Sequence, residues 1–464
     1  MSNIFAVILQ TLCVKLGTIT GLDLAEMCRL NLTPKWNLFM YLCAEIAIIA
    51  TDLAEVVGTA ISLEILFGIP LLYGVLITVL DVLIVLMAYH KDGSLKQTKV
   101  FEILVSILVM ATCVCFILEL FRCPFEPGAG WEIFKGFLPV NKEIFKEKNA
   151  LFLSCGIVGS TVMPHSLFLG SALVQPRLKD FDEKHGLKEV VFIGSDNAQL
   201  SAINPNAPNE TSEDLAPTPM SRLRSLSNGS MLVTKYKPSY EAIKYCLNYS
   251  YAELILSLFI VAVFVNSAIL IVAGATLYGK PDAADADLLS IYEMLSRYIS
   301  PAAGLLFALS MLFSGQSAGI VCTMAGQIVS EGFINWTIAP WKRRIMTRII
   351  AIVPVVIVIG ILGREGVNKV MNSSQVVLSF ILPIVSAPLI YFTCKKKYMV
   401  VHKTSSVSDE TSPLLTSSQD NTDVSKTITY ENGTFLQITS ILTWIIITAL
   451  NIYLIIAFAN GADI

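Results

Sequence analysis

The residues best suited to chemistry lie in one short stretch, residues 156–166, which reads GIVGSTVMPHS. It places a thioether, Met163, and a titratable imidazole, His165, on either side of Pro164, inside an apolar run (residues 150–174) long enough to cross a bilayer. Because proline has no backbone N–H, the helix should break at Pro164. Breaks at membrane depth are tolerated where they are buried or line a cavity, and they mark substrate sites in membrane transporters. The alternative is a proline-kinked helix with a gap-filling methionine and a hydrogen-bonded histidine.

A second set of reactive side chains lies on one apolar stretch, AEIAIIATDLAEVVGTA. Asp52 and Glu55 are three residues apart and therefore share a helical face, and Glu45 lies near the same face. A charge at the bilayer centre costs about 2.5–3.5 kcal/mol, so such residues usually face an interior path. Neighbouring buried carboxylates exchange protons near neutral pH, and the set therefore predicts a proton path. The alternative is structural pairing with another span, through Lys15 or Asp81.

These residues must be positioned by membrane helices. The 464 residues are 54% hydrophobic and only 15% charged, against about 25% charged in soluble domains. Apolar runs of bilayer length recur, which indicates an all-α polytopic membrane protein in contact with lipid. The ten cysteines show neither zinc-binding nor disulfide spacing, and no basic patch indicates a nucleic-acid partner. We predict ten spans, near residues 3–21, 38–61, 70–90, 100–121, 150–175, 251–278, 298–329, 345–362, 373–394 and 436–458.

The loops between these spans predict an orientation. Lys and Arg gather in alternate loops, which the positive-inside rule places in the cytosol, so that both termini face away from it. The basic loops are residues 22–36, 91–99, 331–348 and 395–403.

Two longer polar segments divide the chain. Residues 176–248 are rich in Ser, Asn and Pro and are predicted to form a disordered cytosolic loop with candidate phosphorylation sites. Residues 395–434 form a second cytosolic linker with a dileucine-like sorting signal at Glu410, Leu414 and Leu415, which would bind a sorting adaptor. Chance occurrence of this short motif and an unmodified loop are the alternatives. The resulting regions are 1–175 (five spans), 176–248, 249–394 (four spans), 395–434 and 435–464 (the last span).

Several of these stretches together resemble the Nramp family of divalent metal transporters, and most closely its fungal Smf branch, especially the vacuolar iron-exporting members. The carboxylate-bearing stretch resembles the family's third helix, and VMPHSLFLGS its sixth. SGQS and AGQIVSEGF look like its eighth, WKRR opens what looks like its ninth, and SQVVLS resembles its tenth. The match covers nearly all predicted spans but neither polar linker.

The resemblance implies a LeuT-like fold of two inverted five-helix repeats plus one helix, with metal bound between two broken helices. Carried over, Met163 would supply a sulfur ligand and Ser160 a backbone carbonyl, although the family usually has Ala there. Gln375 would be a ligand in some states, whereas Ile381 stands where many relatives carry a second Gln. The residues implied for the proton route are Asp52, Glu55, His165, Arg343 and Arg344.

The resemblance does not extend to one part of the family's fold. The family's first helix, with its Asp-Pro-Gly-Asn metal-binding motif, has no counterpart here, and the sequence begins at the family's second helix. We therefore expect ten helices (the family's eleven minus the first), and either a start-site truncation or a natural short form. An upstream span would also supply the inverted-repeat partner of the broken helix. As written, the chain is expected to bind metal poorly.

The leading hypothesis is a proton-linked secondary transporter that moves Fe²⁺ or Mn²⁺ into the cytosol, from the vacuole. A thioether beside oxygen ligands favours these ions over Ca²⁺ and Mg²⁺. One alternative is a LeuT-like transporter of an organic cation or amino acid, because fold does not determine substrate. Another is a transport-dead membrane receptor or regulator. We expect neither an enzyme nor a cofactor. The expected location is the vacuolar or endosomal membrane, with the plasma membrane as the alternative.

Overall fold

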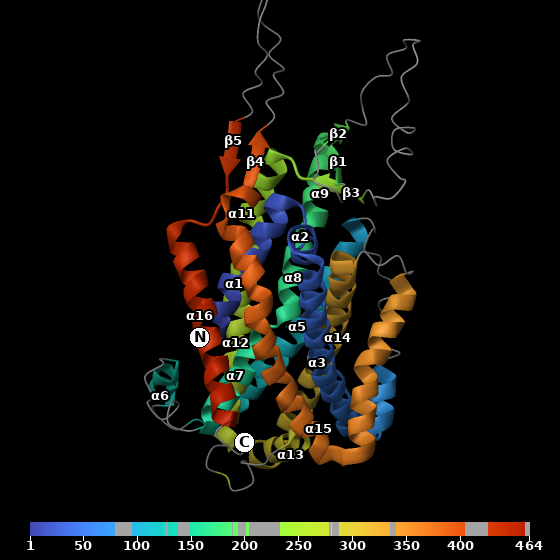
Figure 1. Ribbon diagram of the computed structural model, residues 1–464. Coiled ribbons are helices and arrows are strands. Elements are labelled where there is room, and N and C mark those ends of the chain that lie inside the picture. The colour runs from blue at the N-terminus through green and yellow to red at the C-terminus, as the bar shows by residue number, and fades with distance from the viewer. Residues whose placement is uncertain are drawn as a thin grey trace, which may run out of the picture.

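The protein is a bundle of long helices with two small sheets at one end (Figure 1). The computed structural model describes residues 1–78, 95–123, 125, 129–137, 148–187, 189–193, 201–203, 233–277, 280, 287–334, 340–403 and 426–459. Among these residues, eight helical segments are long and apolar enough to cross a membrane. They are Ser2–Thr20, Pro34–Phe67, Ile103–Arg122, Phe152–His185, Tyr240–Leu277, Pro301–Ile334, Met371–Cys394 and Thr434–Ile456.

The polytopic helical architecture predicted from composition is therefore confirmed. Residues 71–78 are helical, but residues 79–90 of the predicted third span lie outside the described residues. The predicted spans 345–362 and 373–394 fall within one element, α15 (Pro340–Cys394), which turns back along the bundle after a break at Gly363 (Figure 1). There the backbone has φ 62° and ψ −154°, a conformation open mainly to glycine. The total of ten spans stays a prediction.

The remaining helices are of two kinds. Long ones build the bundle: α1 (Ser2–Thr20), α3 (Pro34–Phe67), α5 (Leu95–Arg122), α11 (Tyr240–Leu256) continued by a π-helix (Ser257–Ala262) and α12 (Val263–Leu277), α14 (Pro301–Ile334) and α16 (Thr434–Ala459). Short ones lie at its ends and side: α2 (Leu24–Asn31), α6 (Ala129–Gly136), α13 (Leu288–Tyr298) and a 3₁₀ turn (Lys396–Tyr398).

The predicted helix break is confirmed. Helix α7 (Lys148–Thr161) ends at Thr161, and α8 (Pro164–Ala172) begins at Pro164, so Val162 and Met163 lie between them. Met163 has extended backbone, with φ −66° and ψ 127°. Proline at the first helical position is favourable because that residue's N–H has no partner within the helix.

The core surrounds this break. Helix α3 packs against both α14 and α15, and α8 packs against α1 and α14. Phe168 of α8 contacts Phe333 of α14 edge to face, with ring centroids 5.4 Å apart. Gln10 of α1 donates a 2.7 Å hydrogen bond to the Ser166 hydroxyl. The start of α8 is therefore held by both neighbouring helices.

The prediction that residues 176–248 are disordered is wrong for the described residues of that segment. Helix α9 (Gln175–His185) continues from the broken helix, and β1 (Glu189–Ile193), β2 (Ser201–Ile203) and β3 (Val233–Lys237) form an antiparallel sheet of order β2-β1-β3. The linker 395–434 also contains an ordered hairpin, β4 (Val400–Lys403) with β5 (Lys426–Thr429). Residues 204–232 and 404–425, which include the candidate phosphorylation sites and Glu410, Leu414 and Leu415, lie outside the described residues.

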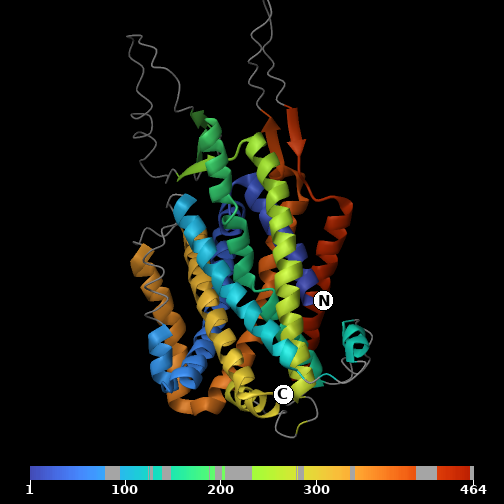
Figure 2. The same ribbon diagram turned by 180° about the vertical axis from the view of Figure 1, so that it is seen from behind.

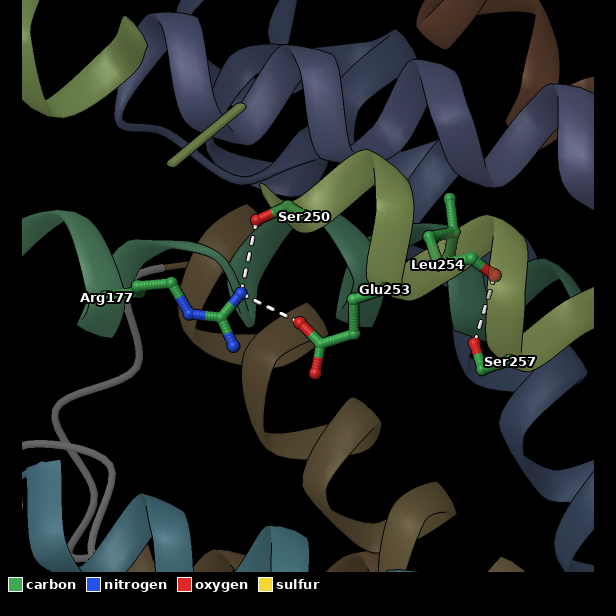
Figure 3. Close-up of polar contacts among 5 residues, drawn as sticks. All are labelled: Arg177, Ser250, Glu253, Leu254 and Ser257. Carbon is green, nitrogen blue, oxygen red and sulfur yellow. Dashed lines mark hydrogen bonds and ion pairs between the residues drawn. The ribbon is translucent and has the colours of Figure 1, made fainter. Parts of the chain in front are cut away.

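Non-local contacts explain why α9 is ordered despite its polar sequence. Leu178 of α9 is fully buried against Ala242 and Cys246 of α11. Arg177 Nη1 lies 2.9 Å from Glu253 Oε2 and 3.3 Å from the Ser250 hydroxyl, both on α11 (Figure 3). These contacts attach the segment that follows the break to a second long helix.

Two of the predicted basic segments lie at the same end of the bundle. Helices α2 and α9 and both sheets lie at one end, and α13 lies at the other, as both views show (Figures 1 and 2). The basic loop 22–36 and the basic residues 395–403 thus lie at the same end, as the predicted orientation requires.

Candidate metal and proton site at the helix break

The break exposes a backbone acceptor that an intact helix would occupy. In a helix the carbonyl of residue 160 accepts from the N–H of residue 164, which is proline here and has none. The Ser160 side chain turns back on its own helix and donates to the Ile157 carbonyl at 3.1 Å. The Met163 carbonyl accepts from the Ser166 N–H at 3.0 Å and from its hydroxyl at 2.7 Å. The Ser160 carbonyl is therefore the acceptor that the break leaves available, one turn before the Met163 thioether.

Gln375 of α15 faces this part of α7. A Cβ placed on Gly159 would lie 2.2 Å from the Gln375 carbonyl oxygen and 2.7 Å from the Ser379 nitrogen, so only glycine allows this approach. The side-chain oxygen of Gln375 is buried and has no hydrogen-bond partner among the described residues. Its amide nitrogen lies 3.5 Å from the Ser374 hydroxyl. The structure thus brings Gln375, with an unsatisfied amide oxygen, against Gly159, the residue before Ser160.

Helix α15 is anchored on the opposite side. Ser379 donates to the side-chain oxygen of Asn451 at 2.8 Å, and the Asn451 amide donates to the Ser379 carbonyl at 2.7 Å. That carbonyl lacks a helical donor because residue 383 is proline. Asn451 of α16 satisfies it, and the Gln375 turn is thereby held against α16.

The imidazole of His165 contacts the carboxylate-bearing helix. His165 is 2% exposed, and its Nδ1 lies 3.3 Å from the Thr51 hydroxyl oxygen. Thr51 itself donates to the Ala47 carbonyl at 2.9 Å, so its oxygen is left to accept from Nδ1–H. This arrangement assigns the ring proton to Nδ1 and leaves Nε2 as an acceptor. Asp52, adjacent to Thr51, is 4% exposed.

Two further carboxylates of α3, Glu45 and Glu55, each have one buried oxygen to which no hydrogen bond is made among the described residues. Lys15, considered from the sequence as a pairing residue, donates instead to Asn432 at 2.8 Å and to the Glu431 carbonyl at 3.1 Å. That pairing with the α3 carboxylates is therefore wrong. Asp81, the other candidate, lies outside the described residues.

Sequence reasoning missed one member of this cluster, Cys322 of α14. Its sulfur and one oxygen each of Asp52 and Glu55 all lie within 4.8 Å of one another. A lone cysteine in an apolar helix is usually a packing residue, so its sequence position carried no signal. Two other predicted residues, Arg343 and Arg344, lie near the start of α15, but their side chains lie outside the described part of the chain.

Comparisons with known proteins agree with this geometry. Residues 1–416 match the family described as natural resistance-associated macrophage protein-like, or Nramp. The Saccharomyces cerevisiae iron transporter SMF3 is 55% identical over 475 residues, which cover 100% of this chain and 89% of the relative. The manganese transporter SMF1 of the same yeast is 43% identical, covering 98% of this chain and 78% of the relative.

Solved structures lead to the same family. A crystal structure of the Eremococcus coleocola manganese transporter has a TM-score of 0.69 and 25% identity, covering 100% of this chain and 81% of that one. A second crystal structure of this transporter, in complex with an aromatic bis-isothiourea compound, has a TM-score of 0.67 and 26% identity. Family match, relatives and fold all agree, and the chain belongs to the Nramp family, with its LeuT-like fold and its transport of divalent metal ions.

Proposed function

We propose that this protein is a proton-linked transporter that moves Fe²⁺ or Mn²⁺ into the cytosol. The observation that carries the proposal is the break between α7 and α8. It combines the Met163 thioether, a Ser160 carbonyl without a helical donor and the unsatisfied amide oxygen of Gln375. These three groups are proposed as metal ligands. The ion is the transported substrate, and the proposal includes no cofactor.

The chemistry of these donors supports a transition metal. Ca²⁺ and Mg²⁺ prefer oxygen ligands alone, whereas Fe²⁺ and Mn²⁺ accept mixed donor sets, and a thioether penalises the harder ions. The relatives named above are an iron and a manganese transporter, which supports the same substrate class. Both relatives are named as transporters, which supports the proposal of a transporter and not of an enzyme.

The proposed proton route runs from His165 through Thr51 to the α3 carboxylates. The 3.3 Å contact between Thr51 and His165 joins the metal-binding break to Asp52 and, one turn later, Glu55. A metal ion at the break and a proton on His165 would repel each other across this short distance, which gives a physical basis for coupling. Arg343 and Arg344 are proposed to complete the route at the start of α15.

The direction of transport is proposed from the orientation of the bundle. The basic end, with α2, α9 and the sheets, would face the cytosol. A vacuolar or endosomal membrane is proposed from the dileucine-like motif at Glu410, Leu414 and Leu415, which is proposed to bind a sorting adaptor.

The test is substrate selectivity in proteoliposomes. Met163→Ala removes the sulfur donor, and we expect Mn²⁺ and Fe²⁺ affinity to fall about tenfold while discrimination against Ca²⁺ is lost, because only oxygen donors remain. The matched control is Met110→Ala, which removes a thioether that is 55% exposed on α5. Unchanged exclusion of Ca²⁺ by the Met163→Ala protein would refute the ligand assignment. Flux of an amino acid that metals do not compete with would refute the substrate class.

A further inference from the structure

A second cluster of metal-binding side chains lies where α3 meets α14. Asp52 and Glu55 are one helical turn apart on α3, and Cys322 approaches from α14, with one ligand atom of each within 4.8 Å of the others. Sulfur and two carboxylates are thus gathered without any residue of α7, α8 or α15. The cluster is therefore built from different groups than the proposed transport site.

The two helices approach each other closely beside this cluster. A Cβ on Gly315 of α14 would lie 2.0 Å from the Thr59 hydroxyl oxygen and 3.5 Å from the Glu55 carbonyl oxygen. Cys322 is 1% exposed, and its thiol donates to the Ile48 carbonyl of α3 at 3.6 Å. The thiol is therefore oriented against the carboxylate-bearing helix.

One of the three side chains also has an unsatisfied hydrogen-bond acceptor. One oxygen of Glu55 is buried and has no hydrogen-bond partner among the described residues. Leaving a buried acceptor unsatisfied is unfavourable, and such a group needs an explanation such as an ion or a proton. This observation is independent of the spacing of the three side chains.

We propose that Asp52, Glu55 and Cys322 form a second divalent-cation site, which takes a thiophilic ion such as Zn²⁺ or Cd²⁺. On binding, the Cys322 S–H bond breaks, the thiolate coordinates the ion and one proton is released. One sulfur and two carboxylate oxygens suit the tetrahedral coordination of these ions, with a water in the fourth position, and discriminate against Ca²⁺ and Mg²⁺. An ion held there occupies both carboxylates of the proposed proton route.

An ion at this second site is expected to inhibit metal transport. That expectation rests on the proposed function, whereas the binding of the ion to the site does not. Because the two proposed sites share no ligand, we expect that raising Mn²⁺ does not relieve the inhibition of Mn²⁺ flux by an ion at the second site. Inhibition by an ion that competes with Mn²⁺ at the transport site, in contrast, is relieved by raising Mn²⁺.

The binding test uses the purified chain and Cd²⁺ alone. Equilibrium dialysis counts ions per chain, and the ultraviolet charge-transfer band reports cadmium–thiolate bonds. We expect Cys322→Ser to lose one Cd²⁺ per chain together with the band. Cys155→Ser, which alters another fully buried free cysteine, is expected to lose neither. An unchanged band and stoichiometry in Cys322→Ser would overturn the site.

A second variant keeps the test decisive if Cys322→Ser fails to fold. Glu55→Gln retains the thiol and the side-chain volume but removes the carboxylate charge, and we expect its Cd²⁺ affinity to fall at least tenfold. Wild-type affinity in a folded Glu55→Gln protein would contradict the three-ligand site.

The Met163→Ala variant distinguishes the proposed transport function from the proposed second cation site. If both hold, this variant loses Mn²⁺ affinity but keeps the cadmium–thiolate band, and Cys322→Ser loses the component of Cd²⁺ inhibition that Mn²⁺ does not relieve. A wild-type band without Mn²⁺ flux would refute the proposed function and leave the second site standing. Mn²⁺ flux together with a cadmium–thiolate band that is lost in Met163→Ala and kept in Cys322→Ser would refute the second site and leave the proposed function standing.

Discussion

At the scale of single residues, the site is built from groups that the fold leaves unsatisfied. Gln375 has a buried amide oxygen without a hydrogen-bond partner among the described residues, and Pro164 deprives the Ser160 carbonyl of its helical donor. A buried polar group without a partner costs about 1–3 kcal/mol. These groups therefore lower stability, and an ion that binds them recovers the loss.

This relation predicts opposite effects on stability and binding. Gln375→Leu removes the unsatisfied oxygen, so we expect the metal-free protein to be more stable, by about 1 kcal/mol or more. The same change removes a proposed ligand, so the apparent Mn²⁺ affinity should fall about tenfold. Thermal unfolding in detergent with and without Mn²⁺ measures both quantities. Gln437→Leu, an exposed glutamine of α16, is the control and should change neither. A less stable Gln375→Leu protein would contradict the assignment of the amide oxygen as unsatisfied.

At the scale of elements, the close approach of α7 and α15 determines the geometry of the candidate metal site. The two helices meet at Gly159, where a methyl group would lie 2.2 Å from a backbone oxygen. Backbone atoms cannot rotate away as a side chain can, so the helices themselves would have to move apart. The Asn451 contacts to Ser379 hold α15 against α16 and resist this movement.

Gly159→Ala should therefore separate α7 from α15. We expect a loss of about 1–3 kcal/mol in the free energy of unfolding, and weaker Mn²⁺ binding because Gln375 is displaced. Gly274→Ala in α12 is the matched control, since nothing lies within 4 Å of its added methyl group. Alanine is the better helix former, so the control should gain about 0.5–1 kcal/mol. Equal thermal shifts for the two variants would show that the helices are not in contact at Gly159.

At the scale of the whole molecule, the broken helix is tied to the rest of the bundle through its continuation, α9. Asp182 of α9 is fully buried and accepts hydrogen bonds from the Tyr236 hydroxyl, from the Ser239 N–H at 2.9 Å and from the Ser239 hydroxyl at 2.5 Å. Burial, followed by the bond to Asp182, raises the pKa of Tyr236 well above its usual value, so the phenol stays a donor at physiological pH. The adjoining pair of Arg177 and Glu253 is exposed and contributes at most about 1 kcal/mol.

Loss of the buried hydrogen bonds to Asp182 should accordingly destabilise the protein more than loss of an exposed ion pair. Asp182→Asn replaces an acceptor oxygen by a donor and leaves a buried donor unmatched, at a cost of about 1–3 kcal/mol. We expect faster amide hydrogen exchange in α9 and β3. Asp180→Asn, which removes only the exposed pair with Lys184, should cost about 0.3–0.5 kcal/mol and leave exchange in β3 unchanged. Exchange rates that do not distinguish the two variants would contradict the role of Asp182.

The sequence by itself determined the features that depend on neighbours along the chain. Apolar runs specified the membrane helices, and Pro164 specified the break, because a missing N–H acts within one helical turn. The spacing of Asp52 and Glu55 placed them on one face for the same reason. These expectations, and the family resemblance, are confirmed by the structure and the comparisons.

Only the tertiary structure decided which helices meet. It placed Cys322 beside Asp52 and Glu55, and it gave the polar segment after the break an ordered start, because buried contacts with α11 compensate for its weak local preference. It also bonded Lys15 to Asn432 instead of to a carboxylate of α3. Such pairings join residues tens to hundreds of positions apart, and they depend on the packing of whole helices, which no local pattern of residue types encodes.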